Sequence, residues 1–343
     1  MAAFFDDSLL DDEEALARAD LELRALAEAG SRVRREAVEV GEALARALSE
    51  ADRDARPRAV VAAGPDSRLL RAVLEPWCPV PFVAWPNPSL PGWAGALDLV
   101  IVLAPEGGDM GAASAVAEAI RRGCQVVVAC PPHSTVAEHA VGRHSTVLPA
   151  ASGDQLATAV VMLQYLSRVE LGPDTEPEAV AQALDDVAVA CSPYVSQTDN
   201  PAKMLAIALA DATPILWGGS VLAARAARRI AESIRRSSGR AALAADAEHL
   251  LPILQSAKQR DVFADPFADD EPADLSPCLV ILDDGSEDAT IREGRGRLVV
   301  AATDRAIRIE SIESKAPNDV ARYAALLATG RYAATYLGVG LSG

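Results

Sequence analysis

The sequence predicts an α/β protein with two similar halves, each a parallel sheet flanked by helices in three layers. Three observations lead to this prediction. Continuous apolar runs alternate with stretches of helical spacing, which is typical of parallel strands covered on both faces. The chain has 343 residues, more than one hydrophobic core usually serves. Half of the residues are hydrophobic, which argues against disorder over most of the length.

The first half opens with an acidic helical segment. Ser8 is expected to cap its first helix with its side chain. The acidic residues after it also favour a helix start, because they lie at the positive end of the helix dipole. Apolar residues continue at helical spacing as far as Leu48. Gly30 is expected to divide this stretch into two helices, and Pro57 is expected to end it. We therefore predict an N-terminal acidic helix over 1–30.

The first domain is predicted over 31–171. Its expected strands are 58–64, 80–85, 97–104, 125–130 and 146–149. Its expected helices include one through Leu69 to Leu74 and those over 112–122 and 155–169. The strand at 58–64 runs directly into a glycine turn, as strands of a parallel sheet often do before a helix.

The second domain is predicted over 172–343, beginning with the proline-rich connector Gly172-Pro-Asp-Thr-Glu-Pro. Its expected strands are 213–219, 240–245, 279–282, 298–302 and 307–312. Its expected helices are one through Leu184 and Val187, one starting at 200, and those over 220–236, 248–257 and 318–336. The stretch 261–274 is rich in Asp, Pro and Phe without a period, which predicts a surface loop, with a substrate lid as the alternative.

The charge of the chain excludes several classes of partner. The formal net charge is −17 and the pI is about 4.7, so nucleic acid and anionic membrane surfaces would be repelled. No apolar run approaches the ~20 residues that cross a bilayer. Asp6 and Asp7 are the opposite of a basic signal-peptide start. We expect a soluble, cytoplasmic protein.

The cysteines and histidines predict neither disulfides nor a metal site. Five cysteines are widely spaced and form no C-x-x-C pair, which is typical of buried reduced thiols. His133, His139 and His144 lack the spacing and the supporting carboxylates of a zinc motif. We expect no metal and no other cofactor.

Three turns with small residues follow predicted strands: Gly64-Pro-Asp-Ser67, Glu106-Gly-Gly-Asp109 and Gly218-Gly219-Ser220. Ligands of parallel sheets bind at such turns, at the carboxyl ends of the strands. None of the three matches a Walker loop or a G-x-G-x-x-G fingerprint, so nothing supports nucleotide binding. Gly-Gly-Ser before a helix offers bare amides and a hydroxyl to an anion. The same residues also suit a plain tight turn with a serine cap.

A resemblance to a known family appears in the second half. Asn200-Pro-Ala-Lys203 precedes a strand ending in glycine, and then the helix stretch Ala224-Arg-Ala-Ala-Arg-Arg-Ile-Ala-Glu-Ser233. This order resembles the bifunctional phosphoglucose/phosphomannose isomerases of the sugar-isomerase (SIS) family. Their helix carries A-R-x-x-x-x-x-N-E-N, whose glutamate moves a proton between C1 and C2. Glu232 stands at the glutamate's position, with Ala231 and Ser233 in place of the asparagines.

Two further segments resemble that family. Asp246-Ala-Glu-His249 is similar to its P-E-x-x-H-N segment, with one residue inserted, and Tyr332-Ala-Ala-Thr-Tyr336 is similar to its closing helix. The resemblance implies two SIS domains, a sugar phosphate ligand and a homodimer. It also implies Glu232 as the base and His249 as the ring-opening group. The residues expected near the ligand are Gly64, Ser67, Gly218, Gly219, Ser220 and Arg225.

The sequence also departs from the family pattern. The family holds phosphate with loops of the type S-G-N-T, whereas the corresponding turn here is Pro105-Glu-Gly-Gly-Asp-Met110, with two carboxylates and no hydroxyl. Carboxylates beside a phosphate would weaken its binding. The family's lysine near the C-terminus is also missing, since no lysine follows Lys315. Glu232 could simply pair with Arg228 or Arg236 on a solvated helix face.

Two functions therefore stay open. The first is aldose–ketose isomerisation of hexose 6-phosphates, converting glucose 6-phosphate or mannose 6-phosphate into fructose 6-phosphate. This chemistry needs one base and one donor that stabilises the enediolate. The second is a catalytically inactive SIS protein, a sensor or scaffold in sugar-nucleotide or mannose metabolism. The acidic turn favours the second function.

Overall fold

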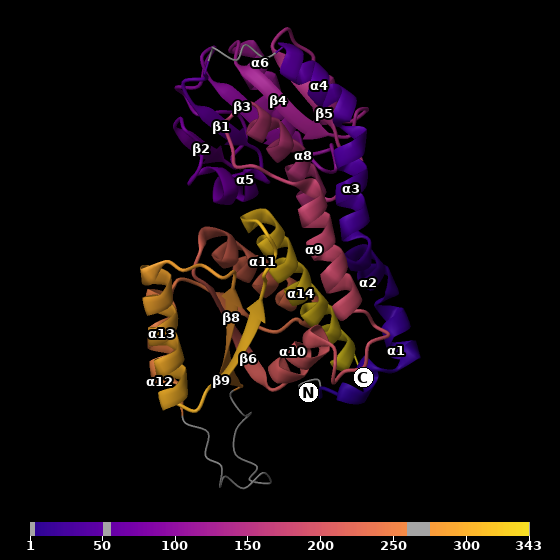
Figure 1. Ribbon diagram of the computed structural model, residues 1–343, viewed down its shortest axis with the longest axis vertical. Coiled ribbons are helices and arrows are strands. Elements are labelled where there is room, and N and C mark those ends of the chain that lie inside the picture. Colours follow the sequence, from indigo (N-terminus) through magenta and orange to yellow (C-terminus); the bar gives the residue numbers. More distant parts are fainter. Residues whose placement is uncertain (1–3, 51–55, 259–274, 343) are drawn as a thin grey trace, which may run out of the picture. The chain divides into compact units, whose positions relative to one another are not determined.

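The computed structural model describes residues 4–50, 56–258 and 275–342, and the chain forms two compact units (Figure 1). One unit, here called the five-stranded unit, is Ala29–Gln182. The other, the four-stranded unit, combines Met1–Glu28 with Ala183–Gly343. The N-terminal segment belongs to this second unit because it packs on the C-terminal helix, where the Asp6 amide donates to the carbonyl of Gly340 at 2.9 Å. The predicted loop over 261–274 lies outside the described residues.

The five-stranded unit has a parallel sheet in the order β2-β1-β3-β4-β5. Its strands are β1 (Val60–Ala63), β2 (Phe82–Trp85), β3 (Leu99–Leu103), β4 (Gln125–Cys130) and β5 (Ser145–Pro149). Its helices are α3 (Ala29–Glu39), α4 (Gly41–Glu50), α5 (Ser67–Leu74), α6 (Met110–Arg121), α7 (Thr135–His139) and α8 (Gln155–Arg168). The apolar strands β1 and β3 are buried throughout, which confirms the prediction of a sheet covered on both faces.

The four-stranded unit has a second parallel sheet, in the order β7-β6-β8-β9. Its strands are β6 (Ala212–Gly218), β7 (Leu243–Ala244), β8 (Ser276–Asp283) and β9 (Arg308–Glu313). Its helical elements are η1 (Asp7–Leu10), α1 (Glu13–Arg18), α2 (Asp20–Ala27), α10 (Pro201–Leu209), α11 (Val221–Ser238), α12 (Ala247–Ser256), α13 (Ala289–Asp304) and α14 (Asp319–Gly340). Helix α9 (Pro177–Ala190) begins in the five-stranded unit and ends in this one.

Helices cover both faces of the second sheet, so this unit has three layers (Figure 1). Leucines of α12 and α13 pack with Ile215 and Ile281 of the strands on one face. Helices α10, α11 and α14 lie on the other face. Within the described residues, no helix is long and apolar enough to cross a membrane.

Two local predictions were wrong. The predicted strand over 298–302 lies inside α13, where Leu298 and Ala302 are buried four residues apart while Val300 is 59% exposed. An apolar run this short is ambiguous until its partners are known. Ser8 does not cap α1, because Asp12 does: its carboxylate accepts from the amide of Ala15 at 2.8 Å. Ser8 lies instead in η1.

Helices α11 and α14 pack closely along their length, which fixes the surroundings of several polar residues. A side chain at Gly330 would lie within 2.3 Å of Ile230, so only glycine permits this approach. The Ser237 hydroxyl donates to the carbonyl of Ala334 at 2.7 Å. The middle and the last turns of α11 therefore pack on the second half of α14.

Candidate functional site

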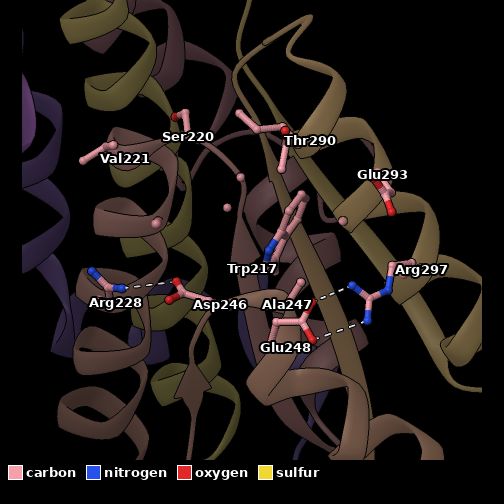
Figure 2. A pocket seen from close by; sticks show the side chains of 15 residues that line it. Trp217, Ser220, Val221, Arg228, Asp246, Ala247, Glu248, Thr290, Glu293 and Arg297 are labelled. Carbon is pink, nitrogen blue, oxygen red and sulfur yellow. Dashed lines mark hydrogen bonds and ion pairs between the residues drawn. The ribbon is translucent and has the colours of Figure 1, made fainter. Parts of the chain in front are cut away.

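A pocket of about 570 Å³ lies at the carboxyl end of β6, between α11, α12 and α13 (Figure 2). This is where a parallel sheet binds ligands. The indole of Trp217, the next-to-last residue of β6, stands between α12 and α13. Of the residues predicted near the ligand, Gly218, Gly219 and Ser220 line this pocket together.

The two glycines are required by close packing. A Cβ at Gly218 would lie 2.3 Å from the carbonyl carbon of Ala223, and one at Gly219 would lie 2.3 Å from Ile291. Ser220 caps α11, because its Oγ accepts from the Ala223 amide at 3.1 Å. The same hydroxyl donates to the carboxylate of Asp284. The turn is therefore a capped helix start beside a carboxylate, which disfavours an anion at this point.

The charged side chains of the pocket are mostly paired. Arg228 lies 3.5 Å from Asp246, and Arg297 lies 2.5 Å from Glu248, as Figure 2 shows. Glu293 adds a further carboxylate to the lining. Two guanidinium groups thus face three carboxylates, so the lining disfavours an anion in this pocket.

Glu232 lies on the exposed side of α11, one turn beyond Arg228. Its Oε2 accepts from Nη1 of Arg229 at 2.6 Å, so its ionic partner is neither Arg228 nor Arg236. Both side chains of the pair are about 40% exposed, at 39% and 41%. The other carboxylate oxygen, Oε1, has no hydrogen-bond partner among the described residues, which leaves it available to a ligand.

Arg225 and Tyr323 form the buried end of the same cluster. The Nε atom of Arg225 is buried and has no hydrogen-bond partner among the described residues. Burial lowers the pKa of Arg225, while the neighbouring Tyr323 hydroxyl opposes that shift. Tyr323 is 2% exposed, and burial raises its pKa against the effect of Arg225 and Arg229. Tyr323 could not be predicted from the sequence as a neighbour of Arg225, because only the packing of α14 on α11 places it here.

His249 belongs neither to the pocket nor to the cluster of Arg225, Arg229, Glu232 and Tyr323. It lies exposed in the first turn of α12, and its amide bonds the carbonyl of Asp246. Its neighbour Glu248 lines the pocket, but His249 does not. Its predicted role in ring opening stays a prediction.

The predicted residues of the five-stranded unit lie at the end of β1. Gly64 has a φ of +87°, which favours glycine, and the Ser67 amide donates to its carbonyl. The Ser67 side chain is 1% exposed, and its hydroxyl has no hydrogen-bond partner among the described residues. In the neighbouring acidic turn Glu106 is exposed, and Asp109 caps α6 by accepting from the Ala112 amide at 2.6 Å.

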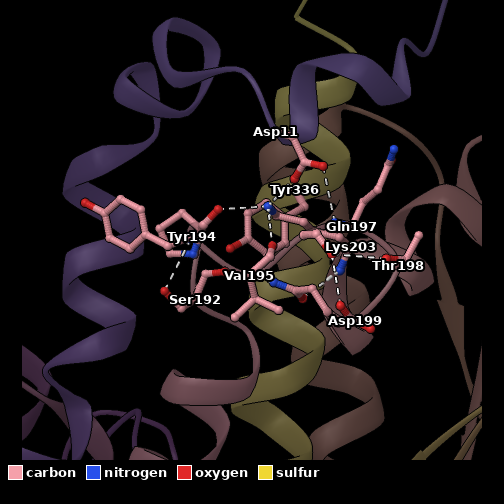
Figure 3. A network of polar contacts seen from close by, with 12 residues as sticks. Asp11, Ser192, Tyr194, Val195, Gln197, Thr198, Asp199, Lys203 and Tyr336 are labelled. Carbon is pink, nitrogen blue, oxygen red and sulfur yellow. Dashed lines mark hydrogen bonds and ion pairs between the residues drawn. The ribbon is translucent and has the colours of Figure 1, made fainter.

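The Asn200-Pro-Ala-Lys203 motif has a structural role (Figure 3). Asn200 caps α10 by accepting from the amides of Ala202 and Lys203. The Lys203 side chain is fully buried, and its ammonium donates to Asp11 and to the carbonyls of Pro193 and Val195 at 2.8–2.9 Å. All three donors of the ammonium are used, so this lysine holds the loop before α10 in place.

The cysteines and the possible metal ligands were also located in the described ranges. All five cysteines are free thiols, and burial raises the pKa of Cys191 and Cys278 to about 12. Such thiols are not reactive nucleophiles at neutral pH. Across residues 4–50, 56–258 and 275–342, no group of three or more His, Cys, Asp or Glu side chains is placed to hold a metal ion.

Two comparisons show which known proteins the chain is similar to. Solved structures with this fold include a proposed phosphosugar isomerase from Silicibacter pomeroyi (TM-score 0.66, 13% identity, 91% of this chain and 95% of that chain covered). Tagatose-6-phosphate ketose/aldose isomerase from Escherichia coli is also similar (TM-score 0.61, 13% identity, 93% of this chain and 91% of that chain covered). The C-terminal domain of glucosamine-fructose-6-phosphate aminotransferase from Francisella tularensis is similar too (TM-score 0.62, 11% identity, 93% of this chain and 95% of that chain covered). The chain thus shares the fold of these structures.

The second half can be assigned more narrowly. Residues 198–341 match the family model of the bacterial phospho-glucose isomerase C-terminal SIS domain. The second half of the chain is therefore similar to the C-terminal SIS domain of bacterial phosphoglucose isomerases. A comparison with curated protein sequences gave no match.

Proposed function

We propose that the protein binds a hexose 6-phosphate on the four-stranded unit and interconverts its aldose and ketose forms, with Glu232 as the base. The main support for this proposal is the Glu232 carboxylate. One of its oxygens accepts from Arg229 at 2.6 Å, and the other has no partner among the described residues. A positioned carboxylate with one open oxygen suits the transfer of a proton between C2 and C1.

The chemistry follows from these side chains. In the open-chain aldose, Oε1 of Glu232 would take the proton from C2, and the electron pair of that C–H bond would form the enediolate. Returning that proton to C1, while the proton of the C2 hydroxyl moves to the oxygen on C1, gives the ketose. Negative charge develops on the enediolate oxygen, and the guanidinium of Arg225 or Arg229 would stabilise it. The base and the stabilising donors therefore come from one helix face.

The pocket would hold the sugar itself. Arg228, which lines it, is four residues from Glu232, so the two side chains share a face about 6 Å apart along α11. Gly218, Gly219 and Ser220 close the other end of the pocket. His249 is proposed as the ring-opening group, and a homodimer is proposed as the working assembly.

A second candidate is a catalytically inactive sugar sensor or scaffold. Two observations favour it: His249 is exposed outside the pocket, and the Glu106 to Asp109 turn carries carboxylates where the family has a phosphate loop. A coupled assay of fructose 6-phosphate formation from glucose 6-phosphate and mannose 6-phosphate separates the two functions. Turnover by the purified protein supports the isomerase, and saturable binding of the sugar phosphate without turnover supports the sensor.

A further inference from the structure

The pocket of about 570 Å³ at the carboxyl end of β6 contains charged side chains whose hydrogen-bonding capacity is unused. The Arg228 guanidinium lies 3.5 Å from the Asp246 carboxylate, and no hydrogen bond joins the two groups. The Glu293 carboxylate, on the α13 side of the pocket, makes neither a hydrogen bond nor an ion pair within the described ranges. Donors and acceptors are therefore available to a ligand on two sides of the pocket.

Asp246 gives up the usual role of an aspartate at its position. It is the N-cap residue of α12, but its side chain makes no cap hydrogen bond. An aspartate at an N-cap ordinarily accepts from an amide two or three residues later, as Asp288 does at the start of α13. The Asp246 carboxylate points toward Arg228 instead (Figure 2). Its oxygens are therefore open to the pocket and not used by the helix.

A glycine inside α13 leaves room beside Trp217. Gly294 lines the pocket, although glycine weakens a helix because it loses more conformational freedom on folding than any other residue. Packing does not require this glycine, since an added Cβ would lie 3.6 Å from the indole and 3.8 Å from Ala247, which are ordinary contacts. The missing side chain thus leaves space in the pocket next to an apolar wall, to which Ile291 also contributes.

We propose that this pocket binds the uncharged, hydroxylated carbon chain of a sugar, so that an unphosphorylated hexitol or hexose is a ligand in its own right. A hydroxyl both donates and accepts, so it can accept from Arg228 and donate to Asp246 or Glu293. The C–H groups of the chain would contact the apolar wall. Because carboxylates outnumber guanidinium groups in the lining, the phosphate of a bound sugar phosphate stays outside the pocket.

This inference rests on the proposed function for the kind of ligand, but it needs no turnover. The test is calorimetric titration of the full chain with D-glucitol, an open-chain hexitol without phosphate. The wild type should bind it saturably, and an equal concentration of inorganic phosphate should not compete. No saturable binding by the wild type, or displacement of D-glucitol by phosphate, would overturn the proposal.

A variant that fills the pocket should abolish this binding. Gly294→Leu places a side chain beside Trp217 and should weaken D-glucitol binding by at least about tenfold. Its melting temperature should be kept or raised, because leucine is the better helix former. The matched control is Gly296→Leu, two residues later in α13, which lines no part of the pocket and has no atom within 4 Å of its added Cβ. Equal affinity of the two variants would overturn the proposal.

A polar variant tests the hydroxyl contacts separately. Arg228→Gln should weaken D-glucitol binding by about tenfold, as expected for the loss of a charged hydrogen bond. Arg236→Gln, at an exposed position in the last turn of the same helix, should leave the affinity unchanged. Binding of D-glucitol without turnover of hexose 6-phosphates would contradict the isomerase alone, and turnover without binding of D-glucitol would contradict the pocket proposal alone.

Discussion

The Nζ atom of Lys203 lies 2.8 Å from Oδ1 of Asp11, although 192 positions separate the two residues. The contact joins the N-terminal segment to the loop that precedes α10 (Figure 3). The Tyr336 ring of α14 lies 5.4 Å from the same ammonium, and its hydroxyl donates to the carbonyl of Cys191. One buried lysine thus connects three segments of the four-stranded unit.

Replacing this lysine should destabilise the fold. Lys203→Met leaves the carbonyls of Pro193 and Val195 without their donor, and should lower the free energy of unfolding by about 3 kcal/mol. Urea denaturation followed by circular dichroism measures the change. Lys315→Met, at an exposed position, is the control and should change stability by less than about 0.5 kcal/mol. Equal stability of the two variants would contradict a structural role for Lys203.

The same pair should contribute to acid sensitivity. The hydrogen bond from Lys203 lowers the pKa of Asp11 below the ordinary value of an aspartate. A carboxyl whose pKa is lower in the folded state adds stability above its unfolded pKa, and this stability is lost as the pH falls through the folded pKa. Asp11→Asn should therefore flatten the decline of stability below about pH 4. Asp11 is 41% exposed, so the effect should stay below about 1 kcal/mol. Urea midpoints from pH 2 to 6 that fall equally steeply in both proteins would refute this contribution.

The turn that enters α11 should not tolerate a side chain. Gly218→Ala would place a Cβ 2.3–2.6 Å from the backbone of Ala223 and Ala224, and the turn and pocket must then shift. We expect a loss of about 1–3 kcal/mol and weaker sugar binding. Gly108→Ala is the control, because no atom lies within 4 Å of its added Cβ. A Gly218→Ala protein with wild-type stability and binding would show that the pocket does not depend on this approach.

The acidic turn of the five-stranded unit should be neutral toward phosphate. In the double variant Glu106→Ser with Asp109→Ser, the serine at 109 can still cap α6. If the phosphate binds on the four-stranded unit, as proposed, the affinity for fructose 6-phosphate should stay unchanged, because exposed charges outside the binding site are screened by salt. A clear rise in affinity would place the phosphate at this turn instead. Titration at constant ionic strength distinguishes the two results.

Most of the fold could be predicted from periodicity. The strand over 125–130 was predicted at the bounds of β4, because its continuous apolar run is typical of a buried parallel strand. The error at 298–302 has a physical cause, since a short apolar run fits a buried strand and a helix stripe equally well. The sequence could not predict that residues 1–28 belong to the same unit as the second half of the chain, because this depends on long-range contacts such as that of Lys203 with Asp11.

The candidate site could be predicted only in part. Gly218, Gly219 and Ser220 line one pocket because they are adjacent in sequence at the end of a strand. The pairing of Glu232 with Arg229, and the position of Tyr323 beside Arg225, depend on side-chain direction and on the packing of α11 against α14. No spacing rule in a single sequence fixes such contacts between two helices.

The most direct test of the account is the coupled isomerase assay with Glu232→Gln beside the wild type. The wild type should form fructose 6-phosphate from glucose 6-phosphate or mannose 6-phosphate, and the variant should lose at least about a hundredfold in rate. Its fold should be kept, because the lost ion pair is exposed. Glu75→Gln, which breaks the exposed pair with Arg71, should keep full activity. Wild-type turnover in Glu232→Gln would contradict the assignment of the base, and absence of turnover in the wild type would contradict the isomerase itself.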